Sequence, residues 1–259
     1  MPRKYFLFVA VLLFLFGATV GMGQGLYVTA NAGYSFGAGT QDFDASYDFT
    51  NPSAGGDAVH GSYGEGFKFG VSAGYMFSGN LGAELGFAYW RGNLIESQRK
   101  FASDVGTTKK CGSGFVALPS IVVSANTEPV SPYARIGLVL GILKVKNGYE
   151  VQSASHPQDI MQEETGNLAI GYAGAVGLLV PAGSTVGFFV EASIHTVTYS
   201  PDQSEYTKFL DNGVDLLPSR PHKVYKFRES FNFDQDDVYM AARRPFSSIG
   251  VVVGVKINL

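Results

Sequence analysis

Hydrophobic side chains recur at every second position over eight long stretches of this chain. Successive side chains of a β-strand point to opposite faces, so each stretch predicts a strand with one apolar face. The pattern is clearest at the C-terminus, where Ile249, Val251, Val253, Val255 and Ile257 alternate with small or polar residues. The eight predicted strands span residues 26–36, 67–77, 81–90, 115–124, 133–142, 168–180, 185–199 and 246–259.

The connections between these strands alternate in length. Three are turn-sized and rich in Gly, Asn, Ser and Pro: 78–80, 125–132 and 181–184. The other four are long, and outside segment 222–233 we take them to be loops without regular structure: 37–66, 91–114, 143–167 and 200–245. Outer-membrane barrels have short periplasmic turns and longer extracellular loops. The pattern therefore predicts an all-β fold, an eight-stranded antiparallel up-and-down transmembrane β-barrel with periplasmic termini.

The second face of the strands decides between a membrane barrel and a soluble barrel of the lipocalin type. That face carries small residues, among them Gly70, Gly74, Gly250 and Gly254. Small side chains suit the lumen of a barrel that is only just wide enough for side chains to fill. We expect the apolar face to meet lipid, with aromatic girdles at the two interfaces that include Tyr133, Tyr199 and Phe246.

The N-terminus has the pattern of a signal peptide, which we assign to residues 1–23. Arg3 and Lys4 precede an apolar run over 5–16, and small residues at Gly21 and Gly23 suit a signal peptidase. The alternative is an uncleaved anchor, although a membrane-spanning helix needs about 20 apolar residues. The expected mature barrel covers 24–259.

Composition excludes several classes of function. Without Arg3 and Lys4, 17 basic residues face 22 acidic ones, which gives no reason to expect a nucleic-acid partner. Cys111 is the single cysteine, so no internal disulfide forms. Neither a metal-ligand spacing nor a phosphate-binding glycine loop is found, and we expect no cofactor and no metal.

Three segments resemble the small outer-membrane β-barrel family of Gram-negative bacteria, the eight-stranded, porin-like relatives of the membrane domains of outer-membrane proteins A and X. They are GFKFGVSAGYMFSGNLGAELGFAYW at 66–90, SPYARIGLVLG at 131–141 and GVVVGVKINL at 250–259. The usual family ending is Phe, whereas this chain has Leu259. The resemblance implies a fold and an outer-membrane location, and it implies no single activity because fold does not fix function.

Four charged residues fall on the small-residue face at similar heights: Glu84, Arg135, Glu191 and Lys256. Two acids and two bases balance, as buried charges must. We expect them to form a salt-bridged network that fills the lumen. The alternative is a narrow, ion-conducting constriction.

Glu191, Ser193 and His195 alternate on one face of the seventh strand and are the residues that a catalytic site would use. Some eight-stranded outer-membrane enzymes cleave or transfer lipid acyl groups. Here the three side chains are expected to point inward, away from lipid, and no third group orients a Ser–His pair. We therefore expect no catalytic residues and no enzyme.

The long loops are expected to carry the function, because binding residues concentrate on loops held by a rigid scaffold. In the fourth loop, segment 222–233 has strand-like aromatics and predicts a β-hairpin continuing strands seven and eight, with an interaction edge formed by Tyr225, Phe227, Phe231 and Phe233. Basic residues of the same loop are candidates for lipopolysaccharide phosphates: Lys223, Lys226, Arg228, Arg243 and Arg244.

The sequence thus predicts an integral outer-membrane protein with a structural or surface-interaction role. Its expected partners are outer-membrane lipid and lipopolysaccharide, the barrel assembly machinery through the C-terminal strand, and an extracellular ligand that the sequence does not name. The alternative function is a narrow passive channel, and a lipid-modifying enzyme is the third.

Overall fold

The structure, a computed structural model, describes residues 25–259 except 39–40, 52, 54, 103 and 231–236. The predicted signal peptide lies outside the described residues. Within them, the chain forms β-strands joined by turns and short connections. No helix in this part of the chain is long and apolar enough to cross a membrane.

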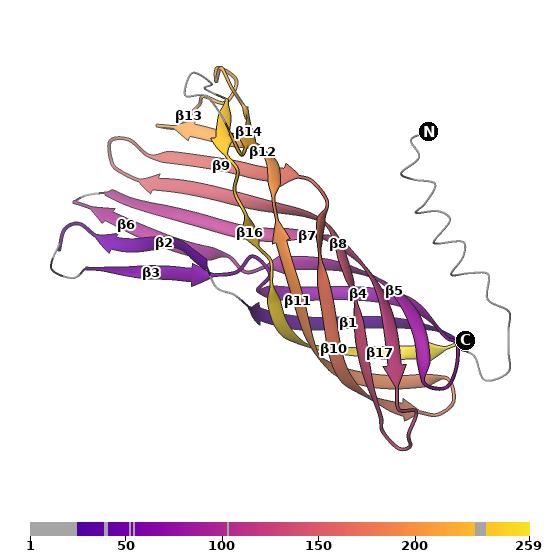
Figure 1. The fold of residues 1–259 in the computed structure, drawn as a ribbon. Coiled ribbons are helices and arrows are strands. Elements are labelled where there is room, and N and C mark those ends of the chain that lie inside the picture. Colours follow the sequence, from indigo (N-terminus) through magenta and orange to yellow (C-terminus); the bar gives the residue numbers. More distant parts are fainter. Residues whose placement is uncertain (1–24, 39–40, 52, 54, 103, 231–236) are drawn as a thin grey trace, which may run out of the picture.

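Eight of the described strands close into an antiparallel barrel (Figure 1). Each pairs with the next, and the last pairs with the first from Tyr27–Asn258 to Gly37–Ser248. The predicted fold class and all eight predicted strands are confirmed. The barrel strands are β1 (Gly25–Gly37), β4 (Gly66–Met76), β5 (Leu81–Gly92), β7 (Asp104–Ser124), β8 (Ser131–Gln152), β10 (Ala169–Ala182), β11 (Val186–Tyr199) and β17 (Ser248–Asn258).

The apolar face of these strands points outward, as predicted. On β17, Ile249, Val251 and Val253 are 52%, 53% and 56% exposed, whereas Gly250 and Val252 between them are buried. The same alternation runs around the barrel and makes a continuous exposed apolar belt, far larger than the patches that soluble proteins tolerate. Such a belt is the lipid-facing surface of a transmembrane β-barrel.

Three aromatic residues assigned to the lipid girdles point into the barrel instead. Tyr199 and Phe246 are fully buried, and the Tyr133 hydroxyl donates a hydrogen bond to a lumenal carboxylate. Parity explains the correction: Tyr199 lies an even number of residues from Glu191, and Tyr133 lies two residues from Arg135. Residues separated by an even number share one face of a strand.

The prediction that the four long connections lack regular structure is wrong, because most of their described residues form further strands. β7 and β8 run beyond the belt and are flanked by β6 and β2–β3 on one side and by β9, β12, β14 and β15 on the other. These strands form an open sheet that extends from one end of the barrel (Figure 1), named here the projecting sheet. Its added strands are β2 (Gln41–Asp48), β3 (Gly56–Gly61), β6 (Ile95–Phe101), β9 (Gln158–Gly166), β12 (Pro201–Asp211), β13 (Val214–Asp215), β14 (Val224–Arg228) and β15 (Val238–Met240); β16 (Arg244–Pro245) pairs with the end of β11.

The hydrophobic pattern did not predict the projecting sheet, because the outer face of this sheet is polar. Ion pairs cross neighbouring strands there, with Lys109 Nζ 2.9 Å from Glu150 Oε2 and Lys144 Nζ 2.7 Å from Glu163 Oε1. Cross-strand pairs of opposite charge stabilise a sheet whose surface meets water. Alternation between apolar and polar residues is therefore absent where both faces are hydrated or covered by polar groups.

An apolar cluster fills the barrel where it meets the projecting sheet. The Tyr63 and Phe246 rings stack with centroids 5.6 Å apart, and Tyr199 meets Phe246 edge to face at 6.0 Å. We name this cluster the apolar plug, since its side chains are at most 3% exposed. Its members are Tyr63, Trp90, Val116, Val139, Leu143, Val145, Ala169, Val197, Tyr199 and Phe246.

Candidate functional site

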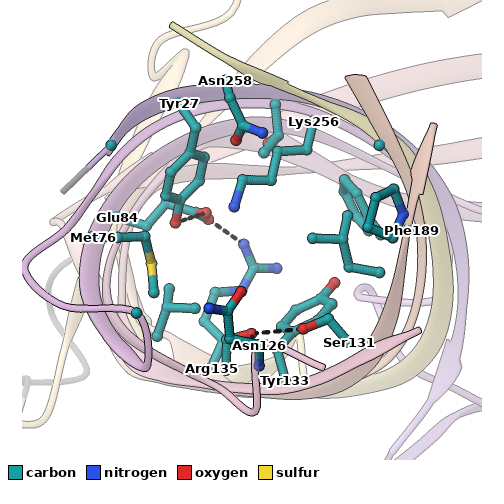
Figure 2. Close-up of a pocket in the computed structure, with 18 of the residues that line it drawn as sticks. Tyr27, Met76, Glu84, Asn126, Ser131, Tyr133, Arg135, Phe189, Lys256 and Asn258 are labelled. Carbon is teal, nitrogen blue, oxygen red and sulfur yellow. Dashed lines mark hydrogen bonds and ion pairs between the residues drawn. The ribbon is translucent and has the colours of Figure 1, made fainter. Parts of the chain in front are cut away.

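Three of the four predicted lumenal charges meet inside the barrel (Figure 2). Arg135 from β8 forms ion pairs with Glu84 from β5 and Glu191 from β11, the latter with Nη2 2.5 Å from Oε1. The carboxylate side chains are only 6% and 2% exposed. One guanidinium therefore bridges two strands across the lumen, and we name this group the charge triad.

Tyrosine hydroxyls satisfy the remaining carboxylate oxygens of the triad. Tyr27 donates to Glu84 Oε2 at 3.0 Å, and Tyr133 donates to Glu191 Oε2 at 2.9 Å. Both rings lie over glycines, Gly74 and Gly177, where a Cβ atom would collide with the ring. Small residues on the inward face thus make the room that lets two tyrosines lie across the lumen.

Lys256 shares this part of the lumen without joining the ion pairs. Its Nζ atom lies 4.1 Å from the centroid of the Tyr27 ring, a cation–π contact. Among the described residues, no carboxylate lies within ion-pair distance of it. Two glutamates and one arginine leave the charge triad with a net charge of −1, and the Lys256 ammonium balances it at slightly longer range.

The charge triad forms the inner wall of a cavity of about 310 Å³ at the short-turn end of the barrel. Figure 2 shows Lys256, Tyr27, Arg135 and Phe189 pointing into the lumen from different sides of the barrel. The triad lies at the inner end of this cavity, and the apolar plug fills the opposite end of the barrel. Side chains therefore fill the lumen at two separate levels.

A second polar group, which the sequence pattern did not predict, lies between the triad and the plug. Lys68 is 5% exposed; its Nζ lies 2.5 Å from Ser248 Oγ, 3.2 Å from His195 Nδ1 and 4.2 Å from the Trp90 ring centroid. No carboxylate of the described residues pairs with it. Its position between Phe67 and Phe69 could have revealed it, because alternation places Lys68 on the inward face.

The catalytic arrangement considered for β11 is not assembled. Glu191 is bonded to Arg135 and Tyr133, His195 Nδ1 faces Lys68, and the buried Ser193 Oγ has no hydrogen-bond partner among the described residues. A nucleophile needs a base within hydrogen-bond reach, and Ser193 has none there. In the same part of the chain, no group of three or more His, Cys, Asp or Glu side chains is placed to hold a metal ion.

Several aromatic residues of the fourth loop that the structure describes lie in the projecting sheet. Tyr225 stacks on Tyr239 with centroids 4.6 Å apart, and Phe227 lies 6.0 Å from the same ring. Arg220 covers Tyr206 at 4.0 Å and donates to the Tyr225 hydroxyl at 3.1 Å. Burial and the hydrogen bond with Tyr206 raise the pKa of Tyr239.

The predicted hairpin is wrong in its pairing. β14 pairs with β12 on one side, antiparallel, and with β15 on the other, parallel, so Tyr225 and Phe227 do not lie on a free edge. The physical reason is that β12 continues strand β11 and offers the nearest unpaired backbone. The two other predicted interaction residues, Phe231 and Phe233, lie outside the described residues.

Charged side chains also form hydrogen bonds at the base of the projecting sheet. Arg244 donates two hydrogen bonds to the buried Glu164, at 2.6 and 2.7 Å, and Asn147 donates a third at 2.7 Å. Farther out, Asp44 accepts hydrogen bonds from Ser97 and Arg99. Partial burial raises the pKa of Asp44, but these bonds outweigh it and hold the pKa below its usual value.

We predict that Arg135→Ala lowers the free energy of unfolding by about 3–5 kcal/mol, because it leaves two buried carboxylates without their cationic partner. The neutral triple variant R135M/E84Q/E191Q should recover most of that loss. Urea unfolding in micelles measures both, with Lys109→Ala on the hydrated outer face as the control that changes little. Equal stability of Arg135→Ala and the native protein would exclude a stabilising role for the triad.

Lys68→Met is predicted to raise the free energy of unfolding by about 1–4 kcal/mol, the range seen when buried charged groups give way to apolar ones of similar volume. Lys68→Arg keeps the charge and should not stabilise the barrel. The same urea titration measures both variants. A less stable Lys68→Met would mean that the ammonium contributes favourably where it lies.

Comparisons with known proteins find likeness only among solved structures. No protein-family model matches the chain, and no curated protein sequence matches it. Neisserial surface protein A aligns at 14% identity and a TM-score of 0.40, covering 92% of this chain and 99% of that one.

Two further solved structures align over a similar span. The attachment invasion locus protein Ail of Yersinia pestis has 16% identity and a TM-score of 0.34, over 92% of this chain and 99% of its own. A major outer membrane protein from Thermus thermophilus has 10% identity and a TM-score of 0.43, over 91% and 99%. Because these three TM-scores are below 0.5, the fold assignment rests on the closed strand pairing and the apolar belt described above.

Proposed function

We propose that this protein is an integral outer-membrane β-barrel that acts as a non-conducting support for a surface-exposed sheet. The observation that carries the proposal is the filled lumen. A barrel whose lumen is filled at two levels is poorly suited to passive transport. We therefore assign its function to the surface of the projecting sheet.

Two different kinds of packing fill the lumen. The charge triad places Arg135, Glu84 and Glu191 across the short-turn half, and Tyr27 and Tyr133 complete its hydrogen bonds. The apolar plug then fills the other half with rings that are almost fully buried. Opening a path would require breaking buried ion pairs and exposing aromatic rings to water, and both are unfavourable.

The projecting sheet offers the surface for interaction. At its far end Phe49 and Phe101 stack with centroids 4.6 Å apart, and both are about half exposed. Tyr47 is 42% exposed and lies 5.8 Å from Phe49. Exposed aromatic clusters on a rigid sheet are a common feature of binding surfaces. This surface, together with Tyr225 and Phe227, is our candidate region for an extracellular ligand.

The proposed orientation places the projecting sheet outside the cell and both barrel termini in the periplasm. Short turns on the periplasmic side and long connections outside are the rule for outer-membrane barrels. In this orientation β17 would be the strand presented to the barrel assembly machinery, and the sheet would emerge among lipopolysaccharide molecules. We propose no enzymatic activity, since Ser193 lacks a base.

We predict that the refolded protein gives no discrete conductance steps in planar bilayers. A general porin refolded in the same way is the positive control for insertion. Steady single-channel steps from this protein would support the alternative function, a narrow passive channel, and would contradict the sealed lumen.

The orientation predicts which lysines a membrane-impermeant amine reagent labels on intact cells. Lys100, Lys208 and Lys223 of the projecting sheet should react, whereas Lys256 in the lumen should react only after the outer membrane is permeabilised. Mass spectrometry of the labelled peptides measures both. Labelling of Lys256 alone on intact cells would reverse the orientation.

A further inference from the structure

Three rows of side chains on the outer faces of β5, β7 and β8 lie one above the other where the belt ends. The lowest row is apolar and consists of Tyr89, Phe115 and Ile142, which are register partners. Phe115 and Ile142 are 69% and 71% exposed, so both face lipid. This row marks the upper limit of the belt on these three strands.

The next row up is basic. Arg91 pairs in register with Ser113, and Ser113 pairs with Lys144, so the two cations flank a small residue on the middle strand. They are two strands apart, about 10 Å. Two residues along a tilted strand raise this row by about 5 Å above the apolar row. That height corresponds to the headgroup layer of a bilayer.

A third cation stands above this row. Lys146 is the register partner of Cys111, directly above Ser113 and Lys144 on the same outward face. Burial raises the pKa of the Cys111 thiol, so it does not add a negative charge to the group. The three basic residues Arg91, Lys144 and Lys146 are named here the basic triad.

The basic triad carries an excess of positive charge. Glu163 is the acid that pairs with it, at 2.7 Å from Lys144 Nζ and 3.8 Å from Lys146 Nζ. Arg91 is exposed and has no side-chain hydrogen bond or ion pair among the described residues. Of the other acids near the basic triad, Glu150 pairs with Lys109 and Asp159 with Lys208, Glu65 accepts a hydrogen bond from Asn93, and Glu96 is the register partner of Lys109. The basic triad and Glu163, the acid within ion-pair distance of it, together carry a charge of +2.

We propose that the basic triad binds the phosphate groups of a phosphorylated lipid in the surrounding leaflet, while Tyr89, Phe115 and Ile142 contact its acyl chains. The inference rests on the proposed function, because it requires that the belt lies in a membrane. A lipid fits better than free phosphate since the site joins a cationic row to an apolar row. In the proposed orientation that lipid is the lipid A part of lipopolysaccharide.

This assignment differs from the basic residues that the sequence suggested. Arg244 is not free to bind lipid phosphate because its Nε and Nη2 atoms donate to the buried Glu164. Lys223 lies next to β14, which contains Lys226, and β14 pairs with the outer part of the projecting sheet rather than with a barrel strand. Headgroup contact requires proximity to the belt, and the basic triad meets that requirement.

The test is a titration of the purified protein in zwitterionic detergent with lipid A, followed by native mass spectrometry to measure the bound fraction. Near a charged lipid surface each basic side chain contributes roughly a fivefold factor in affinity. The variant R91Q/K144Q/K146Q should therefore bind lipid A at least about tenfold more weakly than the native protein. The matched control K100Q/K223Q/K226Q, with the same change in net charge, should bind like the native protein.

Three outcomes would overturn the proposal: equal loss of binding in both triple variants, no loss in either, or full competition by inorganic phosphate. Binding of dephosphorylated lipid A with unchanged affinity would also overturn it. Heat-modifiable migration on gels checks that each variant is folded. If the native protein fails to fold into lipid at all, the proposed membrane function fails; if it folds but shows no phosphate-dependent binding, only the lipid site fails.

Discussion

Closure of the backbone hydrogen bonds between β1 and β17 is the constraint on which the rest of this structure depends. In hydrocarbon there is no water to satisfy an unpaired N–H or C=O group, so a sheet can cross a bilayer only without an edge. The register from Tyr27–Asn258 to Gly37–Ser248 removes both edges at once. Once the sheet is closed, the strand period of two fixes which side chains meet lipid and which fill the lumen.

A closed barrel of eight strands then determines the chemistry of its interior. The lumen is only just wide enough for side chains, so each inward position must be small or must find a partner across the barrel. Gly74 and Gly177 make room for Tyr27 and Tyr133, and these tyrosines complete the hydrogen bonds of the charge triad. The interior is therefore a packed core that happens to be polar in one half and aromatic in the other.

Beyond the belt the constraint changes, because water can form hydrogen bonds with the unpaired N–H and C=O groups of an edge strand. β7 and β8 continue as strands, and an open sheet forms around them that tolerates hydrated edges. Charges appear on its outer face in cross-strand pairs, and the three cations nearest the belt outnumber their acid. The same strands thus carry a lipid-facing surface, a headgroup-level surface and a solvent-facing surface in sequence along their length.

Hydrophobic periodicity was sufficient to predict the barrel strands and their facing, since lipid on one side and small residues on the other give a strong alternation. It also brought Glu84, Arg135 and Glu191 to one face. It could not tell that Lys256 would rest on Tyr27, because that depends on side-chain reach across tilted strands. Parity alone would have placed Tyr199 inside, and Lys68 was overlooked between two phenylalanines.

The projecting sheet could not be predicted in the same way. Lys109 lies between Thr108 and Lys110, so no periodic signal marks that part of β7. Lys144 does alternate with the buried Leu143 and Val145, but there the outward face is charged and not apolar, unlike that of the barrel strands. Strand pairing in the projecting sheet depends on the barrel, because β7 and β8 leave the barrel already paired with each other. It also depends on ion pairs between strands that are distant in sequence. Such contacts appear only once the register is known.

The central claim is that odd-numbered residues of β17 face lipid and even-numbered residues face the lumen. Single cysteines at positions 249 to 257, in a chain with Cys111→Ser, can carry a nitroxide label in reconstituted bilayers. Accessibility to oxygen, which concentrates in lipid, should then alternate with a period of two and peak at 249, 251, 253, 255 and 257. The opposite phase, or accessibility without alternation, would contradict the account.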